Sequence, residues 1–311
     1  MDCKPMWHFG CRVSSRSFSS VQNGPSVQQY LKDPVKLIAI PITTHKVFVY
    51  HKHTSDILNV TSKVVKYETK LTNRVSQAWV KLEKSPRKLN RKIVEKINVL
   101  LDKTAWTEDS LNSVPSENYL MKRVWENEKE RLLTFEEWFK NADKLKLRPI
   151  HLYYPGSVCS ETQTRQQLQT LWKQGLEYHK KFTWLSILGI PLTLPLVLVP
   201  VVPNVPGFYL LYRAYRNFKA YNGAKRLRSL MKHEGDSLVY TNLPQYSEIL
   251  RAGLSSSERD QADERVLLDE KMLDRILDTL EIHEIRSSVR KALQQETSRL
   301  QRACTDTCTD T

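Results

Sequence analysis

The chain has 311 residues, enough for one or two domains with a buried apolar core. Hydrophobic residues make up 40% of it and only 9 residues are glycine, which excludes a collagen-like or low-complexity chain. A mean hydropathy of −0.49 excludes a membrane protein built mainly from spanning helices. The net charge is +14; basic side chains predominate in residues 1–233 and acidic ones in residues 234–311. A basic body favours phosphate-bearing partners, either nucleic acid or anionic lipid.

The N-terminus has the composition of a targeting segment. It contains Lys4, Arg12 and Arg16, a single acidic residue and many serines, but no long apolar run. These features are typical of a mitochondrial transit peptide, which we predict over residues 1–18 with cleavage after Phe18. A serine-rich tail without a targeting role is the alternative.

The cysteines and the sequence motifs give no sign of a metal or catalytic centre. Five scattered cysteines do not form the pattern of a disulfide framework and favour a reducing compartment. Cys304 and Cys308 lie in a polar tail without a nearby histidine. The sequence contains no dinucleotide-binding, P-loop, metalloprotease or serine-hydrolase motif. We therefore expect no metal, no cofactor and no enzymatic activity.

Residues 31–160 have the pattern of a small α+β domain, expected in the matrix. Two runs rich in Ile, Val, Phe and Tyr within residues 36–50 predict a β-hairpin, with Pro41 placing the first strand at a sheet edge. His51 and His53 lie on one face of the second strand. Without a third ligand at suitable spacing, we expect them to be solvated rather than to bind zinc.

Helical periodicity dominates the middle of this domain. Apolar residues at three- and four-residue spacing between residues 55 and 101, interrupted at Ser85-Pro86, predict two helices with basic outer faces. A third helix is expected over residues 116–141. Residues 149–155 predict a short strand that could pair with the hairpin.

The most apolar stretch, residues 182–212, follows a linker helix predicted over residues 161–181. It contains no Asp, Glu, His, Lys or Arg, and residues 182–202 are long enough to span a bilayer. Membrane helices tolerate prolines better than soluble helices do. We expect this segment to enter a membrane as a single span or a hairpin; a buried core hairpin is the alternative. The residues expected to shape it are Pro191, Pro195, Pro200, Pro203, Pro206 and Gly207.

A basic amphipathic helix is predicted over residues 207–232. Its apolar side chains fall on one side of a helical wheel and its basic ones on the other. The helix could lie in the membrane interface with its basic face on lipid phosphates, or complete a hairpin in which Arg213 faces a polar cavity. The residues expected to contact phosphate or line the cavity are Arg213, Arg216, Lys219, Lys225 and Arg226.

Residues 257–302 predict charged C-terminal helices. Apolar residues form two stripes, offset near Glu281, which indicate a short coiled coil or a helical pair. Packing against the basic helices and self-association are both open. The predicted fold class is thus α+β, with a small mixed N-terminal domain, a proline-rich membrane-inserted segment or hairpin, and charged C-terminal helices.

The sequence VPVVPNVPGFYLLYRAYRNFKAYNGAKRL carries a family resemblance. Its proline-rich apolar run, Pro-Asn-x-Pro turn, aromatic segment with an arginine, and Ala-x-x-Gly-Ala-Lys motif resemble the signature block of the fungal mitochondrial potassium–proton exchange-related family. The N-terminal segment and Tyr154-Pro155 also fit that family. The resemblance implies an inner-membrane protein needed for potassium–proton exchange.

Two functions are compatible with these features. An exchanger needs a protonatable or cation-binding group within the bilayer, and residues 182–212 lack acidic residues and histidine. The sequence therefore favours a subunit or regulator of potassium–proton exchange in mitochondrial ion and volume homeostasis. Its expected partners are the inner mitochondrial membrane, anionic lipid, and an inner-membrane protein or a second copy of the chain. The alternative is a membrane-tethered matrix protein that contacts mitochondrial ribosomes or RNA through its basic charge.

Overall fold

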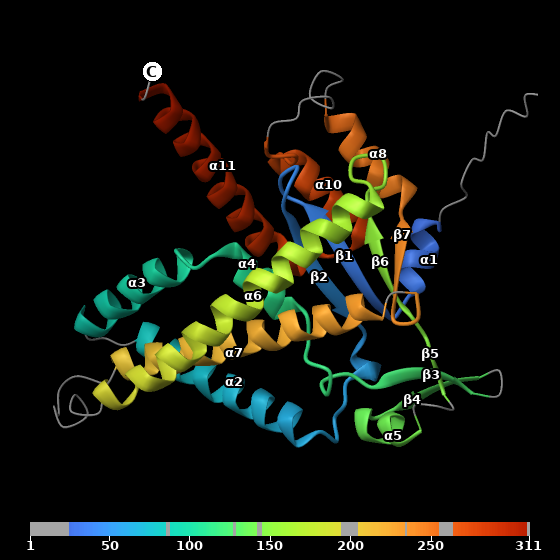
Figure 1. The fold of residues 1–311 in the computed structure, drawn as a ribbon. Helices are drawn as coiled ribbons and strands as arrows, with labels where there is room; N and C mark the ends of the chain where they lie inside the picture. Colours follow the sequence, from blue (N-terminus) through green and yellow to red (C-terminus); the bar gives the residue numbers. More distant parts are fainter. Residues whose placement is uncertain are drawn as a thin grey trace, which may run out of the picture.

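A computed structural model describes residues 25–84, 88–126, 129–141, 145–193, 205–233, 235–254 and 264–309. The predicted transit peptide, residues 1–18, lies outside these ranges, as do Pro195, Pro200 and Pro203. The fold is mixed α+β, as the sequence predicts, and most of the helices surround one four-stranded sheet (Figure 1).

The central sheet has the strand order β2–β1–β6–β7. Its strands are β1 (Val35–Pro41), β2 (Val47–His53), β6 (Ile150–Tyr154) and β7 (Leu238–Asn242). The predicted hairpin is confirmed as β1 and β2, and the predicted strand is β6, which pairs in parallel with β1 and β7. The expectation that Pro41 marks an edge strand is wrong. β1 is an inner strand, but its pairing with β6 extends only to Ile38, so the missing N–H of Pro41 costs no bond on that side.

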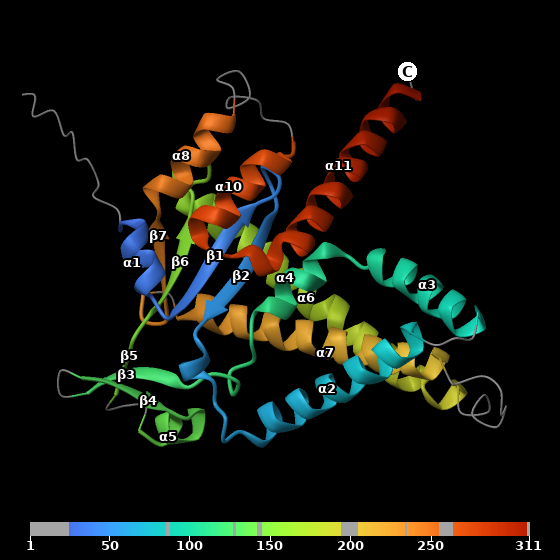
Figure 2. The same ribbon diagram turned by 180° about the vertical axis from the view of Figure 1, so that it is seen from behind.

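Alternating residues of β1 build cores on the two faces of the sheet. Ile38 and Ile40 belong to one buried cluster, and Leu37 and Ala39 to the other. The first cluster draws on α1 (Val27–Lys32), α8 (Pro244–Gly253), α10 (Glu270–Leu280) and α11 (Arg286–Thr309), and on Trp106 at the start of α4 (Trp106–Ser113). The helices that contribute to the second cluster are α4, α6 (Glu161–Gly189) and α7 (Val205–Lys232). Figures 1 and 2 show the two layers from opposite sides.

The two predicted C-terminal stripes are confirmed as α10 and α11, with the short helix η3 (His283–Ile285) between them. Glu281 ends α10 in the left-handed backbone region, with φ 51°. Met272 and Val289 lie in the same buried cluster as Ile38. Both helices cover the sheet, and they also pair with each other, since Arg290 of α11 donates to Glu270 of α10 at 2.9 Å. α11 further contacts the end of the basic helix α3 (Lys88–Asp102), where the Gln295 amide donates to the backbone oxygen of Asp102 at 3.4 Å. Self-association stays a prediction. The predicted domain boundaries themselves stay predictions.

A second sheet replaces the helix predicted over residues 116–141. It has the order β4–β3–β5, formed by β3 (Lys122–Glu126), β4 (Lys129–Leu133) and β5 (Lys146–Leu147). Among the described residues of this range only α5 (Phe135–Lys140) is helical, and the capping box of Thr134 and Glu137 fixes its start. The prediction failed because Trp125 and Leu132 satisfy helical spacing, whereas antiparallel pairing of β3 with β4 determines the actual structure.

Two long helices form an arm beside the sheet. They are α2 (Lys63–Glu83) and α3 (Lys88–Asp102), which follow the short helix η1 (Ser55–Ile57). The two helices predicted within residues 55–101 are thereby confirmed. Figures 1 and 2 show the arm on the side toward which α6 and α7 extend beyond the sheet.

The α6–α7 hairpin contains the described part of the apolar segment. α6 continues from the predicted linker helix to Gly189, and α7 begins at Val205, so the basic helix predicted over residues 207–232 is confirmed. Among the residues that the structure describes, no helix combines the length and hydropathy needed to cross a membrane. Residues 194–204 of the predicted membrane segment lie outside the described residues.

Candidate functional site

Close packing of three helices positions the central site. An added Cβ at Gly223 of α7 would lie 2.0 Å from the backbone oxygen of Leu111 in α4, and one at Gly175 of α6 would lie 2.4 Å from a Leu111 side-chain carbon. Both glycines therefore permit α4 to lie against the hairpin. On its other side α4 is fixed to β2, where the Ser110 hydroxyl accepts a hydrogen bond from the Val49 N–H at 2.8 Å. The first turn of α4 is thus held beneath α7.

Glu108, in that first turn, accepts hydrogen bonds from two arginines of α7. Arg213 donates through Nη1 and Nη2 to the two carboxylate oxygens at 2.9 and 2.8 Å, and Arg216 donates through Nε at 3.2 Å. Glu108 is only 1% exposed. Burial opposes ionisation of Glu108, but the hydrogen bonds and charges of Arg213 and Arg216 hold its pKa below its ordinary value. The group is therefore a buried carboxylate.

Further ion pairs connect this carboxylate to neighbouring helices. Asp109 pairs with Arg216 and also accepts a hydrogen bond from Lys291 of α11 at 3.1 Å. We call Glu108, Asp109, Arg213, Arg216 and Lys291 the charge network. It joins α4 and α7 to α11, which lies partly on the opposite side of the sheet. The network thus connects the hairpin mechanically to the core.

A buried histidine lies next to the charge network between the two helices of the hairpin. His179 of α6 is 2% exposed, and its Nδ1 lies 2.9 Å from Oδ1 of Asn217 in α7. The Asn217 amide in turn donates to the backbone oxygen of Arg213 at 2.8 Å. Burial lowers the pKa of His179, although its hydrogen bond to Asn217 acts in the opposite direction. The neutral imidazole therefore fits this contact.

Of the five predicted basic residues, the three arginines are paired with buried or partly buried carboxylates and the two lysines lie nearer the surface. Arg213 and Arg216 face inward to α4, and Arg226 is paired with Glu117 at 2.6 Å. Lys219 lies 3.5 Å from Glu68 of α2 and is partly exposed, and Lys225 is exposed. The contact of these residues with lipid phosphate stays a prediction. For Arg213 and Arg216 the geometry provides protein carboxylates instead.

The other predicted positions that the structure describes lie where α6 ends and α7 begins. Pro191 and Pro206 are exposed, whereas Gly207 is buried. On α7, Phe218 of the expected apolar side is exposed, whereas Ala214 of the same side is buried. The helical wheel therefore did not show which positions of α7 face the protein.

Sequence reasoning missed Glu108, Asp109, His179 and Asn217. The available signal was that Glu108 and Asp109 are adjacent acids in a strongly basic part of the chain, at the start of a short helix. Nothing in local spacing relates them to α7, about one hundred residues later in the chain.

His51 on β2 is buried rather than solvated, contrary to expectation, and His53 is partly exposed. His51 is 4% exposed, its ring centroid lies 5.4 Å from that of His53, and Nδ1 of each ring is buried without a hydrogen-bond partner. Burial, His53 and Arg226 together lower the pKa of His51 to about 3. No group of three or more His, Cys, Asp or Glu side chains among the described residues could hold a metal ion.

Stability is expected to fall in acid because His51 must become charged on unfolding. Its pKa rises from about 3 in the folded chain to an ordinary 6.5, so its contribution is complete above pH 6.5 and is lost as the pH falls toward 3. The loss is about 1.4 kcal/mol per pH unit. Urea denaturation at several pH values between 5 and 7.5 should show a shallower pH dependence for His51→Phe than for the parent chain. An equal pH dependence of the unfolding free energy in the two proteins would contradict a lowered pKa for His51 in the folded chain.

The comparisons with known proteins agree with the sequence resemblance. Residues 36–231 match the family model described as mitochondrial K+–H+ exchange-related. The chain belongs to this family. The match includes β1, the charge-network residues of α4 and α7, and His179, but ends before α10 and α11.

Two fungal relatives support this membership. The chain is 41% identical to an uncharacterized protein of Saccharomyces cerevisiae over 290 residues, 90% of each chain. It is 30% identical to an uncharacterized protein of Schizosaccharomyces pombe over 200 residues, 64% of this chain and 76% of the relative. No solved structure matches the chain. Family membership relates the protein to mitochondria and to K+–H+ exchange.

Proposed function

We propose that this chain is a subunit or regulator of K+–H+ exchange, attached to the matrix side of the inner mitochondrial membrane. The attachment is made by the end of the α6–α7 hairpin at which α6 ends and α7 begins. The observation that carries the proposal is the exposed apolar surface at that end. We call this surface the hairpin apolar surface; its residues are Trp184, Leu185, Leu188, Leu192, Phe208 and Leu211.

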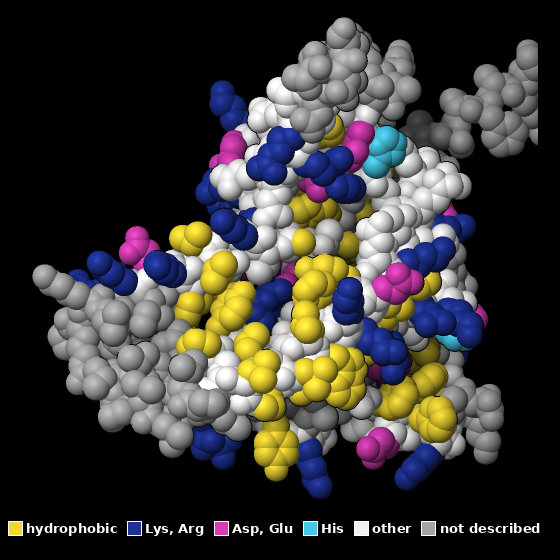
Figure 3. All heavy atoms as spheres, turned by 60° about the vertical axis from the view of Figure 1, so that its left-hand side comes forward, with side chains coloured by type: hydrophobic (Ala, Val, Ile, Leu, Met, Phe, Trp, Pro, Cys, Tyr) yellow, Lys and Arg dark blue, Asp and Glu magenta, His cyan; other side chains and the backbone are white. Residues whose placement is uncertain are grey.

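Interfacial attachment fits the chemistry of this surface. Leu188 is 68% and Leu192 82% exposed, and burying a side chain of this type contributes roughly 1.5–3 kcal/mol. Trp184 is an aromatic residue of the kind that favours the headgroup layer, and Lys180 and Lys181 precede it at the membrane-facing end of α6. Figure 3 shows hydrophobic side chains gathered on this side of the molecule with Lys and Arg around them. Such a pattern suits a surface that enters the headgroup region.

A supporting role rather than self-contained transport follows from the ionisable groups. Coupled exchange needs sites that bind and release a cation and a proton. Residues 182–212 provide no Asp, Glu or His. The buried carboxylate of Glu108 already accepts hydrogen bonds from Arg213 and Arg216, so a potassium ion would have to displace two arginines. The charge network is thus better suited to holding the hairpin than to conducting ions.

Passive swelling of isolated mitochondria in potassium acetate tests the function. Mitochondria that lack this protein should fail to swell, and either nigericin or re-expression of the chain should restore swelling. Normal swelling without the protein would contradict a role in K+–H+ exchange. Cosedimentation with mitochondrial ribosomes would then support the matrix-tethering alternative.

Reconstitution distinguishes a subunit or regulator from an exchanger. The purified full-length chain in vesicles with opposed K+ and H+ gradients should bind the vesicles without collapsing either gradient. Electroneutral exchange by the chain alone would overturn the supporting role while retaining the connection to K+–H+ exchange.

A further inference from the structure

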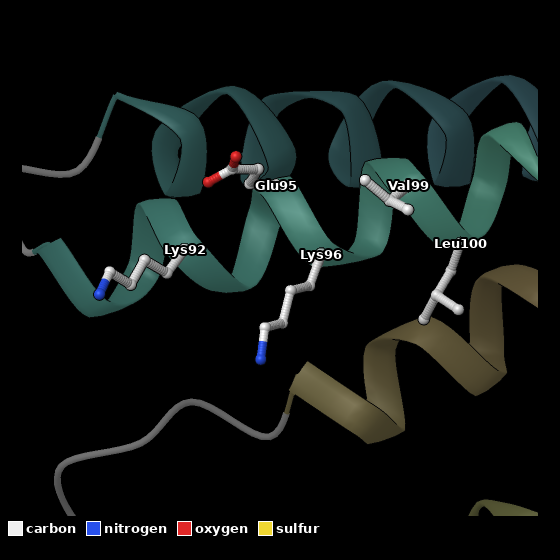
Figure 4. Close-up of a pocket in the computed structure, with 5 residues that line it drawn as sticks. All are labelled: Lys92, Glu95, Lys96, Val99 and Leu100. Atoms are coloured by element: carbon white, nitrogen blue, oxygen red, sulfur yellow. The ribbon is translucent and has the colours of Figure 1, made fainter.

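A hollow on α3 combines positive charge with apolar surface. It has a volume of about 500 Å³ and is lined by Lys92, Glu95, Lys96, Val99 and Leu100. Lys92, Lys96 and Leu100 follow one another at four-residue spacing, which places them on one side of the helix. Figure 4 shows these three side chains on the side toward the α6–α7 hairpin, with Glu95 on the other side of α3. The hollow is therefore basic on its hairpin side.

The two ammonium groups are available to a ligand. Both lysines are exposed, and neither forms an ion pair or hydrogen bond with any of the residues that the structure describes. Val99 and Leu100 beside them are about half exposed. A binding partner that satisfies both parts of the hollow carries an anionic group next to hydrocarbon.

We propose that this hollow binds the phosphate headgroup of an anionic phospholipid, with the start of an acyl chain against Val99 and Leu100. The inference rests on the proposed attachment of the hairpin to a membrane. It adds that the attached protein prefers membranes that contain anionic phospholipid. Lysine ammonium groups bind phosphate as compact point charges. A free phosphate ion would leave the apolar part of the hollow unused. None of the described residues that line the hollow is aromatic, so none offers a ring on which a base of single-stranded RNA could stack.

The position of the hollow relative to the hairpin supports this choice. Lys92 and Lys96 point toward the hairpin whose exposed end carries the hairpin apolar surface (Figure 4). With that end in the headgroup layer, the lysines lie at the level where lipid phosphates are found. Anionic lipids attract basic side chains in such positions, and two lysines together strengthen binding about 30-fold.

Vesicle flotation of the purified full-length chain tests the proposal. The variant Lys92→Gln/Lys96→Gln is compared with Lys63→Gln/Lys66→Gln, which removes the same charge from exposed positions of the neighbouring helix α2. Each protein is mixed with phosphatidylcholine vesicles and with vesicles containing one fifth cardiolipin. We expect the Lys92/Lys96 variant to lose about 30-fold in affinity for cardiolipin vesicles only, and the control variant to lose less than threefold.

Other outcomes overturn the proposal in distinguishable ways. Equal losses for the two double variants would mean that charge acts diffusely and that no headgroup site exists. Competition by millimolar inorganic phosphate, with no preference for cardiolipin, would assign the hollow to free phosphate. Absence of binding to either kind of vesicle by the parent chain would overturn the membrane attachment in the proposed function as well. Circular dichroism confirms that each variant retains its helices.

Discussion

Replacing Glu108 by glutamine is expected to lower the free energy of unfolding by about 3–5 kcal/mol. Glu108 is buried and paired with Arg213 and Arg216. Glutamine retains the shape of the side chain but removes its charge, which leaves two guanidinium groups in a poorly hydrated site with Asp109 as the remaining carboxylate. Urea denaturation followed by circular dichroism measures the change.

Glu161 provides the matched control for this substitution. It pairs with Arg165 at 3.1 Å one turn apart on α6, and both side chains are substantially exposed. Glu161→Gln should change the free energy of unfolding by less than about 1 kcal/mol, because water screens and solvates an exposed pair. Similar small effects for Glu108→Gln and Glu161→Gln would show that the charge network does not stabilise the fold.

Reversing the charge at Arg213 is expected to abolish the ability of the protein to support mitochondrial swelling in potassium acetate. Arg213→Glu places a second carboxylate against the buried Glu108, so the contact between α4 and α7 changes from attraction to repulsion. Mitochondria that carry only this variant should fail to swell in potassium acetate. Lys63→Glu changes charge by the same amount at an exposed position of α2 and should leave swelling intact.

The charge-swapped variant separates a specific ion pair from a general loss of folding. Glu108→Arg combined with Arg213→Glu restores opposite charges at the two positions and should recover part of the stability and swelling lost in Arg213→Glu alone. Equal activity of Arg213→Glu and Lys63→Glu would contradict the importance of the network. No recovery in the double variant would show that the bidentate geometry, rather than the charge, is what matters.

The local elements of the fold were largely predictable because their signals lie within short stretches. The hairpin of β1 and β2 follows from two β-rich runs around a polar turn, and α2 and α3 follow from apolar spacing interrupted at Ser85-Pro86. The break between α10 and α11 was visible as an offset of the apolar stripe. Residues 116–141 were mistaken for a helix because strand pairing there competes with apolar spacing that also suits a helix.

The candidate site was only half predictable. Its arginines stood out as the basic side of α7, but their partners Glu108 and Asp109 come from a helix far away in the sequence. His179 was missed because one histidine within a long helix gives no local signal. Its role emerges only where Asn217 of the next helix reaches it.

The sequence by itself determined the family, the helix α7 and the apolar stretch that precedes it. Only the tertiary structure decided how α7 is rotated. Amphipathicity measures the contrast between two sides of a helix, not which side faces the protein. In this chain the acidic first turn of α4 provides carboxylates that neutralise Arg213 and Arg216. Arg213 and Arg216 therefore face inward while Lys219 and Lys225 stay at the surface, because a buried arginine is tolerated where its charge is paired.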